Sequence, residues 1–292
     1  MRNSLKRLKL LSSWLTLGQQ LLFRLFRQTW AQRYIRFGHA AKGFLYGLIG
    51  LFSMRAVFYD GKSAGGSKAV LATLNDRTIG SVILLLLGVG LFGYSFWRLV
   101  QILIDPDHDQ NSNSIQNVVQ RCGYLCSCLT YLGVGYTSLR LAIGLTVDFD
   151  DTVEEIAEAL FKTPVGPLVL SAAGLGVIVV GLVYIYGAFS ESFIDEFKPE
   201  LYSAVKQSTV AIGKLGYTAR GVSFTLIGAY LLKSAYFVDD EEAGGLGQVL
   251  DRLDDQPYGK IWLTAIAVGF FAYALYMTMS ALYRQLPTKP SR

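Results

Sequence analysis

Three short stretches of the sequence decide the fold, because each opens a long apolar segment with the same pattern. They read Phe37-Gly-His-Ala-Ala-Lys-Gly43, Cys122-Gly-Tyr-Leu-Cys-Ser-Cys128 and Leu215-Gly-Tyr-Thr-Ala-Arg-Gly221. Carrying the register forward aligns one column of glycines and one column of basic residues: Gly50, Gly135 and Gly228, then Arg55, Arg140 and Lys233. Self-similarity at a fixed register is the signature of a repeat architecture. The sequence therefore predicts three copies of one structural unit.

Each copy continues into a second apolar segment that keeps the same register. These segments open at Gly80, Gly166 and Gly259, and a second glycine follows ten residues on at Gly90, Gly176 and Gly269. A short segment with helically spaced apolar residues precedes each opening glycine and ends at Leu74, Leu160 or Leu253. Each copy is therefore predicted to be a pair of long helices joined by a short link.

The composition indicates a membrane protein. Hydrophobic residues make up 52% of the chain and charged residues only 17%, against about 25% charged residues in soluble domains. Six segments approach the roughly 20 apolar residues that a membrane span needs, namely 39–59, 81–104, 122–145, 165–190, 216–237 and 259–283. Their apolar residues do not alternate as barrel strands would. We predict an all-α fold, a polytopic bundle of six transmembrane helices arranged as three repeated pairs.

The expected domain organisation follows from the repeat. Residues 1–33 form a basic N-terminal segment, and residues 285–292 form a polar tail. Repeat 1 covers residues 34–106, repeat 2 covers 118–192 and repeat 3 covers 212–284. Within the N-terminal segment, Trp14, Phe23, Phe26 and Trp30 favour an amphipathic helix over residues 5–30 that lies on the membrane surface. A partly disordered basic tail is the alternative interpretation.

The distribution of Lys and Arg predicts the orientation. Fifteen of these residues lie in the two tails and the loops 105–121 and 191–215, whereas six lie in the loops on the opposite side. Because basic residues are retained in the cytoplasm, both termini are expected on the cytoplasmic side of the cell's inner (plasma) membrane. The lipid bilayer is then one partner, other membrane proteins are further candidates, and the oligomeric state stays open.

The repeated glycines are expected to pack helices against each other. Small residues let two helix backbones approach closely in lipid, where dispersion replaces the hydrophobic effect. A kink or a ligand contact is the alternative role. The glycines concerned are Gly43, Gly50, Gly90, Gly135, Gly176, Gly221, Gly228 and Gly269.

Two sets of basic residues are candidate polar sites. Arg55, Arg140 and Lys233 occupy one column near the outer ends of the first helices and could form a ring that attracts anions. They could equally extend to lipid phosphates or pair with the acidic outer loops. Lys42 and Arg220 share a second column near the inner face, where we expect anchoring at the headgroups; repeat 2 has Ser127 there instead.

Other chemistry finds little support in the sequence. Cys126 and Cys128 replace Ala or Gly of the other copies, so they are interpreted as packing residues rather than as ligands of a metal or as redox groups. We find no catalytic constellation, metal site, cofactor site or nucleic-acid-binding pattern. The spans also lack the buried carboxylates that proton-coupled carriers need.

The repeated motifs resemble a bacterial membrane family known as domain of unknown function 1206. The resemblance is strongest in repeat 3, through Gly216-Tyr-Thr-Ala-Arg-Gly221 and the link from Gly245 to Gly259, and weakest in repeat 2, where Ser127 and Cys128 replace the basic residue and the glycine. It implies a six-span membrane protein and assigns no activity.

Two functions of different classes remain open at this point. The first is a structural or accessory membrane protein that binds other membrane proteins or lipids. The second is a small channel or facilitator for anions, which the threefold repeat and the outer basic column would support.

Overall fold

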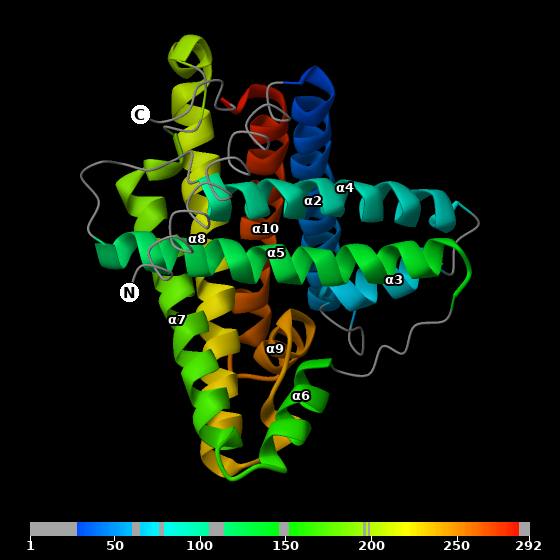
Figure 1. Ribbon diagram of the computed structural model, residues 1–292, viewed down its shortest axis with the longest axis vertical. Coiled ribbons are helices and arrows are strands. Elements are labelled where there is room, and N and C mark those ends of the chain that lie inside the picture. The colour runs from blue at the N-terminus through cyan, green and yellow to red at the C-terminus, as the bar shows by residue number, and fades with distance from the viewer. Residues whose placement is uncertain are drawn as a thin grey trace, which may run out of the picture.

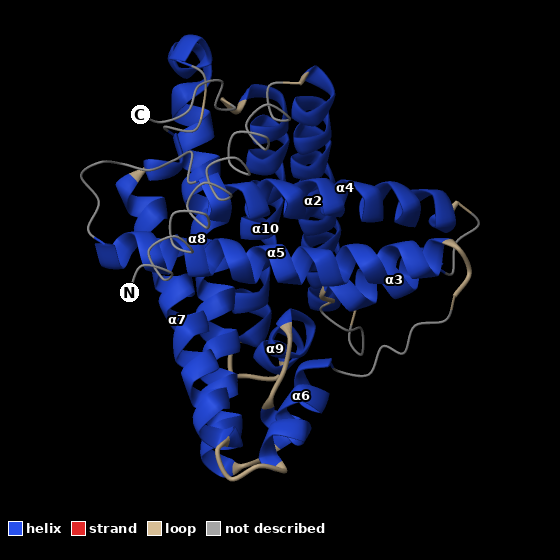
Figure 2. Ribbon diagram, viewed as in Figure 1, coloured by secondary structure: helices blue, strands red, loops and turns tan. Residues whose placement is uncertain are grey.

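The computed structural model describes residues 28–59, 65–75, 79–104, 114–145, 152–194, 197 and 199–285. Figure 2 shows that helices dominate this part of the chain. The α-helices are α2 (Thr29–Phe58), α3 (Ser67–Asn75), α4 (Gly80–Ile104), α5 (Ser114–Ala142), α6 (Thr152–Phe161), α7 (Gly166–Ser190), α8 (Pro199–Phe237), α9 (Leu246–Asp254) and α10 (Gly259–Tyr283). Two short 3₁₀-helices, η1 (Ser192–Ile194) and η2 (Asp240–Glu242), complete the described elements. The all-α prediction is confirmed for these residues.

Helix bounds follow the repeat. The second helices α4, α7 and α10 each contain 25 residues, and the links form the short helices α3, α6 and α9. The first helices α2, α5 and α8 contain 30, 29 and 39 residues, because polar turns extend each of them beyond its apolar stretch at the N-terminal end. At the turns into α7 and α10, a Cβ on Gly166 or Gly259 would overlap the carbonyl of Leu160 or Asp254, so the tight turn requires glycine there.

The long helices form three antiparallel pairs, and each pair joins the second helix of one repeat to the first helix of the next. These pairs are α4 with α5, α7 with α8, and α10 with α2. In each pair the two helices touch at a glycine. A Cβ added to Gly88 would lie 3.0 Å from a backbone oxygen of the partner helix, and the same distance would be 2.9 Å for Gly174 and 3.1 Å for Gly50. The contacts are equivalent by register, so the same positions pack the helices together in all three pairs.

Within repeats 1 and 3, the two long helices also cross closely. A Cβ on Gly38 would lie 2.9 Å from Tyr94 Cα, and a Cβ on Gly216 would lie 2.7 Å from Tyr273 Cα. Gly90 and Gly269 similarly admit the methyl groups of Ala41 and Ala219. In Figure 1, α2, α7, α8 and α10 run along the long axis of the molecule, and the α4–α5 pair lies across them.

Among the described helices, four are long and apolar enough to cross a membrane, namely α2, α4, α7 and α10. Helix α7 is the most apolar and also the least buried of them, with Leu168, Tyr186 and Phe189 all more than 70% exposed. A continuous apolar surface of this kind would aggregate in water but suits a lipid environment. The described part of the chain thus has four apolar candidate spans, as expected for a membrane protein.

Two finer predictions are not settled by these features. The more polar helices α5 and α8 do not qualify as spans on length and composition among the described residues. Six transmembrane helices therefore remain a prediction. The amphipathic helix over residues 5–30 falls almost entirely outside the described residues.

Candidate functional site

Repeat 2 differs from its neighbours because its two long helices, α5 and α7, do not close on each other. Gly123 and Gly176 occupy the columns of Gly216 and Gly269, yet a Cβ on either would have no atom within 4 Å. Helix α5 still packs on α4, and α7 still packs on α8. The opening is therefore confined to the contact within repeat 2.

A cavity of about 730 Å³ occupies the space left between α5 and α7. We call it the middle-repeat cavity. Gly123, Cys126 and Ser127 line it from α5, and Gly176 and Val180 line it from α7. A volume of this size lies within the range of ligand pockets, and exposed lining residues such as Cys126 and Gly176 leave it open toward the outside of the helix bundle. The divergent repeat therefore contains a binding-sized pocket.

The residues that close repeats 1 and 3 are missing from repeat 2. In repeat 1, Lys42 donates from Nζ to the Tyr94 hydroxyl at 2.7 Å. In repeat 3, Arg220 donates to the Tyr273 hydroxyl in the equivalent way. The corresponding residues of repeat 2 are Ser127 and Val180, which line the cavity. Loss of a long basic side chain and of an aromatic ring leaves the space that the other copies fill.

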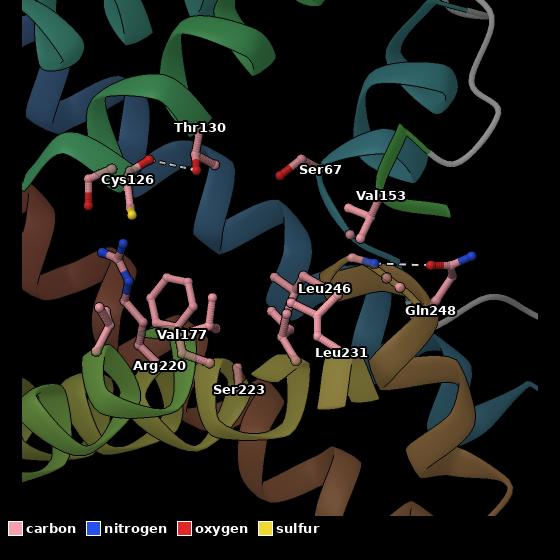
Figure 3. Close-up of a pocket in the computed structure, with 18 of the residues that line it drawn as sticks. Ser67, Cys126, Thr130, Val153, Val177, Arg220, Ser223, Leu231, Leu246 and Gln248 are labelled. Carbon is pink, nitrogen blue, oxygen red and sulfur yellow. Dashed lines mark hydrogen bonds between the residues drawn. The ribbon is translucent and has the colours of Figure 1, made fainter. Parts of the chain in front are cut away.

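Arg220 of α8 stands at one end of the cavity. Figure 3 shows its guanidinium directed toward Cys126 across the cavity, while Ser67, Val153 and Gln248 lie at the opposite end. The residue is only 2% exposed. Among the described residues no carboxylate pairs with it, and its Nε atom has no hydrogen-bond partner. A buried guanidinium thus faces an apolar space without a counter-ion.

Aromatic rings partly compensate the Arg220 charge. The guanidinium carbon lies within 6.0 Å of five ring centroids, those of Tyr46, Tyr131, Tyr184, Phe224 and Tyr273. Each cation–π contact contributes about 0.5–2 kcal/mol, whereas burial of an unpaired ion costs several kcal/mol. The rings reduce this cost but supply no negative charge.

Lys42 lies on the other side of the same tyrosines. It is fully buried, and its Nζ atom lies 4.7 Å from the Tyr131 centroid and 5.3 Å from the Tyr273 centroid. The structure places Lys42 and Arg220 inside the bundle rather than on its lipid-facing surface, where headgroup anchors were expected. The two side chains share the rings of Tyr131 in repeat 2 and Tyr273 in repeat 3, and this packing is invisible in any one helix.

The far end of the cavity is formed by the links. Gly66, Ser67 and Lys68 come from the start of α3, and Leu246 and Gln248 come from α9. Gln248 accepts from the Gly245 amide at 3.0 Å and donates to Glu154 of α6 at 3.4 Å. The links of all three repeats thus meet around this end.

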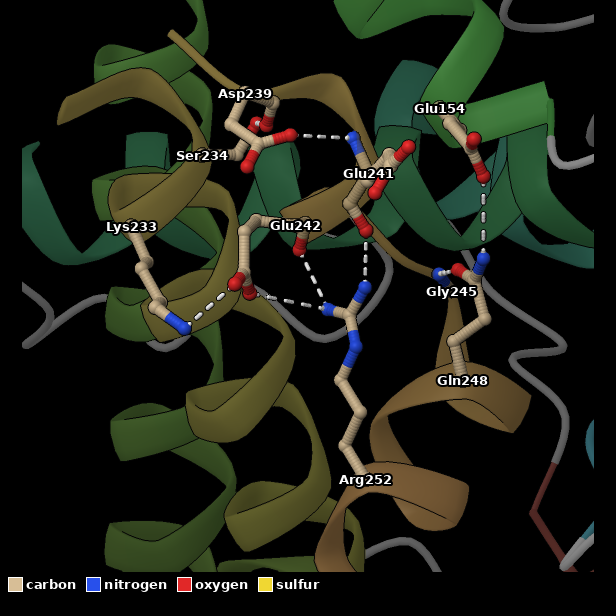
Figure 4. A network of polar contacts seen from close by, with 9 residues as sticks. All are labelled: Glu154, Lys233, Ser234, Asp239, Glu241, Glu242, Gly245, Gln248 and Arg252. Atoms are coloured by element: carbon tan, nitrogen blue, oxygen red, sulfur yellow. Dashed lines mark hydrogen bonds and ion pairs between the residues drawn. The ribbon is translucent and has the colours of Figure 1, made fainter. Parts of the chain in front are cut away.

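A second polar network stabilises the link of repeat 3 (Figure 4). Glu242 pairs with Lys233 at 2.7 Å and with Arg252 at 3.8 Å, and Arg252 also donates to the Glu242 carbonyl at 2.6 Å. The structure therefore uses Lys233 in this local network. Of its two column partners, Arg140 lies over the Tyr136 ring at 5.8 Å and Arg55 is exposed on α2. The anion ring of these three residues stays a prediction.

The predicted packing glycines fall into two groups. Gly43, Gly50, Gly90, Gly135, Gly221, Gly228 and Gly269 lie at helix crossings, where a Cβ would meet the neighbouring helix. Gly176 does not, because it faces the cavity. One glycine of the set thus lines a candidate site instead of a packed interface.

The three cysteines likewise lie in two different places, one in a helix–helix contact and two at the cavity. Cys128 is buried and its thiol donates to the Ser95 carbonyl at 3.4 Å, in the contact between α4 and α5. Cys122 and Cys126 are exposed and line the cavity. All three are free thiols, and the described part of the chain holds no cluster of three or more metal-ligating side chains.

Sequence reasoning identified the divergence of repeat 2 but missed the cavity and the tyrosines around it. Tyr94 and Tyr273 share a column with Val180, and this column was the available signal. Tyr46 and Tyr131 share a further column with Phe224, and this aromatic column was also available in the sequence. Tyr184 is recognisable only from the packing.

Similarity to known proteins extends over all three repeats. The sequence model of the family described as Domain of Unknown Function (DUF1206) matches residues 37–102, 122–191 and 215–284. The chain is 27% identical over 261 residues to "Uncharacterized protein YxxB" of Bacillus subtilis (strain 168), covering 88% of this chain and 92% of that protein. No solved structure matches. Because the family model covers most of the chain in three tandem regions, the protein belongs to the DUF1206 family.

Proposed function

We propose that this protein is a lipid-binding accessory protein of the bacterial inner membrane, which holds one acyl chain in the middle-repeat cavity. The proposal places both termini in the cytoplasm. The six bilayer crossings that the sequence predicts stay a prediction, because the α4–α5 pair lies across α2, α7, α8 and α10 (Figure 1). The cavity is the observation that carries the proposal. It lies in the one repeat whose closing residues are replaced.

The walls of the cavity fit an acyl chain. Val177, Val180, Ile227, Leu231 and Leu246 present aliphatic side chains to it. Arg220 and Leu231 stand eleven positions apart on α8, which corresponds to roughly 16 Å along a helix. The cavity is thus long enough for one alkyl tail. Its exposed side, at Cys126 and Gly176, gives a tail a route from the surrounding lipid.

The facilitator alternative depends on Arg55, Arg140 and Lys233 acting together. Lys233 is engaged by Glu242, so a conducting ring would have to break that pair. Chloride flux into vesicles that contain the purified protein tests this alternative directly. Flux that disappears in the triple alanine variant would favour conduction over lipid storage or presentation.

Cavity-filling substitution tests the lipid proposal. Gly123→Leu places a side chain in the cavity, and Gly133→Leu is its matched control, because both glycines lie on α5 with no atom within 4 Å of an added Cβ but only Gly123 lines the cavity. Lipid extracted from each purified variant is quantified by mass spectrometry. We expect the wild type and Gly133→Leu to retain about one bound acyl lipid, and Gly123→Leu to lose it. Equal lipid content in all three would contradict the proposal.

Topology is tested separately with reporter fusions. A reporter in the 146–164 connection is expected outside the cytoplasm, and reporters at either terminus are expected inside it. A cytoplasmic signal from the 146–164 connection would overturn the proposed orientation without affecting the cavity.

A further inference from the structure

We infer that the cavity ligand is a single-chain amphiphile with an anionic head, a carboxylate or a phosphate, and that Arg220 binds this head at the end of the cavity that it shares with Cys126. The inference rests on the proposed lipid-binding function and adds the charge and the orientation of the ligand. Arg220 provides the evidence because it is a fully desolvated cation that no protein carboxylate neutralises among the described residues.

The geometry of Arg220 leaves part of its donor set available. The guanidinium carries five N–H donors in a planar fork suited to carboxylate and phosphate oxygens. One terminal nitrogen donates to the Tyr273 hydroxyl, while Nε has no partner. A buried donor without an acceptor is costly, and an oxyanion at the end of the cavity would satisfy it. Charge-assisted hydrogen bonds of this kind are the strongest that proteins make.

Two further cations, Lys42 and Arg98, lie near Arg220 and make an anion more favourable at this end of the cavity. Lys42 and Arg220 both lie over the Tyr131 and Tyr273 rings, and Arg98 donates to the Tyr94 hydroxyl at 2.7 Å. Three cations therefore surround one group of tyrosines, and the sequences of α2, α4, α5, α7 and α10 place no Asp or Glu beside them. The local field is positive at this end of the cavity and attracts a negative head.

The opposite end is less suited to an anionic head. Lys68 lines the cavity there, but Asp251 lines it too, and Glu154 lies beside Gln248. A carboxylate or phosphate at that end would meet two acidic side chains. The charge distribution thus orients the ligand with its head at Arg220 and its tail toward α3 and α9.

Four probe molecules distinguish binding of the anionic head from binding of the alkyl chain. In a neutral detergent, laurate and dodecyl phosphate supply an anionic head with a chain, dodecanol supplies the chain alone, and inorganic phosphate supplies the anion alone. Binding is measured by protection of Cys126 from a maleimide in a variant whose other two cysteines are serine. We expect laurate and dodecyl phosphate to protect at least about tenfold better than dodecanol, as one charge-assisted bond predicts, and inorganic phosphate not to protect. A preference for inorganic phosphate would identify the ligand as a free anion and overturn the amphiphile.

Substitutions of the basic residues at the two ends of the cavity test where the anionic head of the ligand binds. Arg220→Gln is expected to remove the preference for laurate over dodecanol, Arg220→Lys to retain part of it, and Lys68→Gln at the other end to leave it unchanged. Loss of the preference in Lys68→Gln instead would reverse the orientation and contradict the inference. If Arg220→Gln does not fold, the comparison of laurate with dodecanol on the unmodified cavity still decides the question. Equal protection by the two probes, abolished by Gly123→Leu, would reject the anionic head and keep lipid binding; no protection by any probe would reject both.

Discussion

Repeat 3 and repeat 2 contain the same helix pair, yet one is closed and the other is open. In repeat 3, Gly216 admits the backbone of Tyr273, and Arg220 donates to the hydroxyl of that tyrosine. In repeat 2, Gly123 faces empty space, and the basic residue and tyrosine are Ser127 and Val180. Repeat 1 resembles repeat 3 in both contacts. The difference shows that two positions distinguish a packed pair from a pocket.

The contacts between repeats are present in all three helix pairs, whereas α5 and α7 do not close on each other within repeat 2. Cys128 packs on Ser95, as Gly221 packs on Gly181 and Gly43 on Ala274. These three contacts occupy equivalent positions in the register. Repeat 2 is therefore held in place by its neighbours, and its own pair is free to form a site. This explains how a stable bundle tolerates an internal opening.

The largest expected effect is on stability and tests whether repeat 3 is closed as tightly as its contacts indicate. Gly216→Ala forces a Cβ to 2.7 Å from Tyr273 Cα, and overpacking of this kind costs about 1–3 kcal/mol. Gly123→Ala meets no atom and is expected to leave the free energy of unfolding unchanged or slightly raised. Thermal unfolding in detergent measures both. Equal midpoints for the two variants would remove the distinction between open and closed repeats.

The next largest effect is on ligand content, and it is tested by giving repeat 2 the closing residues of repeat 3. Ser127→Arg combined with Val180→Tyr restores the basic residue and the ring where the cavity now lies. The new side chains fill the space, so the affinity for lipid should fall at least about tenfold, which corresponds to about 1.4 kcal/mol of binding free energy, and the bound lipid should fall with it. Mass spectrometry of extracted lipid measures the change, with Gly133→Leu as the control. A double variant that folds and still carries the wild-type amount of lipid would place the ligand elsewhere.

The smallest effect concerns the link of repeat 3. Lys233 is 48% exposed and its partner Glu242 is 27% exposed, and exposed ion pairs contribute about 0.2–1 kcal/mol. Lys233→Ala should therefore lower the free energy of unfolding slightly and leave lipid content unchanged. Chemical denaturation and lipid analysis on the same preparation give both values. A loss of bound lipid would show that the Figure 4 network, rather than repeat 2 alone, maintains the cavity.

The sequence predicted the repeated framework well, because register and hydropathy are local properties. The second helices begin within one residue of the expected positions, at Gly80, Gly166 and Gly259. The first helices begin earlier than expected, since polar residues before the apolar stretch continue the same helix. Six spans and the orientation remain predictions, because α5 and α8 carry more polar residues than composition alone can place in a membrane.

The candidate site could be predicted only in part. The replacement of the basic residue by Ser127 is visible in the sequence, but Gly123 and Gly176 look the same as the packed glycines of the other copies. Whether such a glycine packs or lines a cavity depends on a helix from elsewhere in the chain. The burial of Lys42 and Arg220 was missed for the same reason: the rings that surround them come from three repeats, and sequence spacing within one helix does not report them.

An experimental density map of the protein in a lipid nanodisc would show directly whether repeat 2 is open and occupied. We expect α5 and α7 to stand apart at Gly123 and Gly176, with an elongated density between them that ends at the Arg220 guanidinium. Gly123 packed against Val180, in the way that Gly216 packs against Tyr273, with no space between the helices, would contradict this expectation.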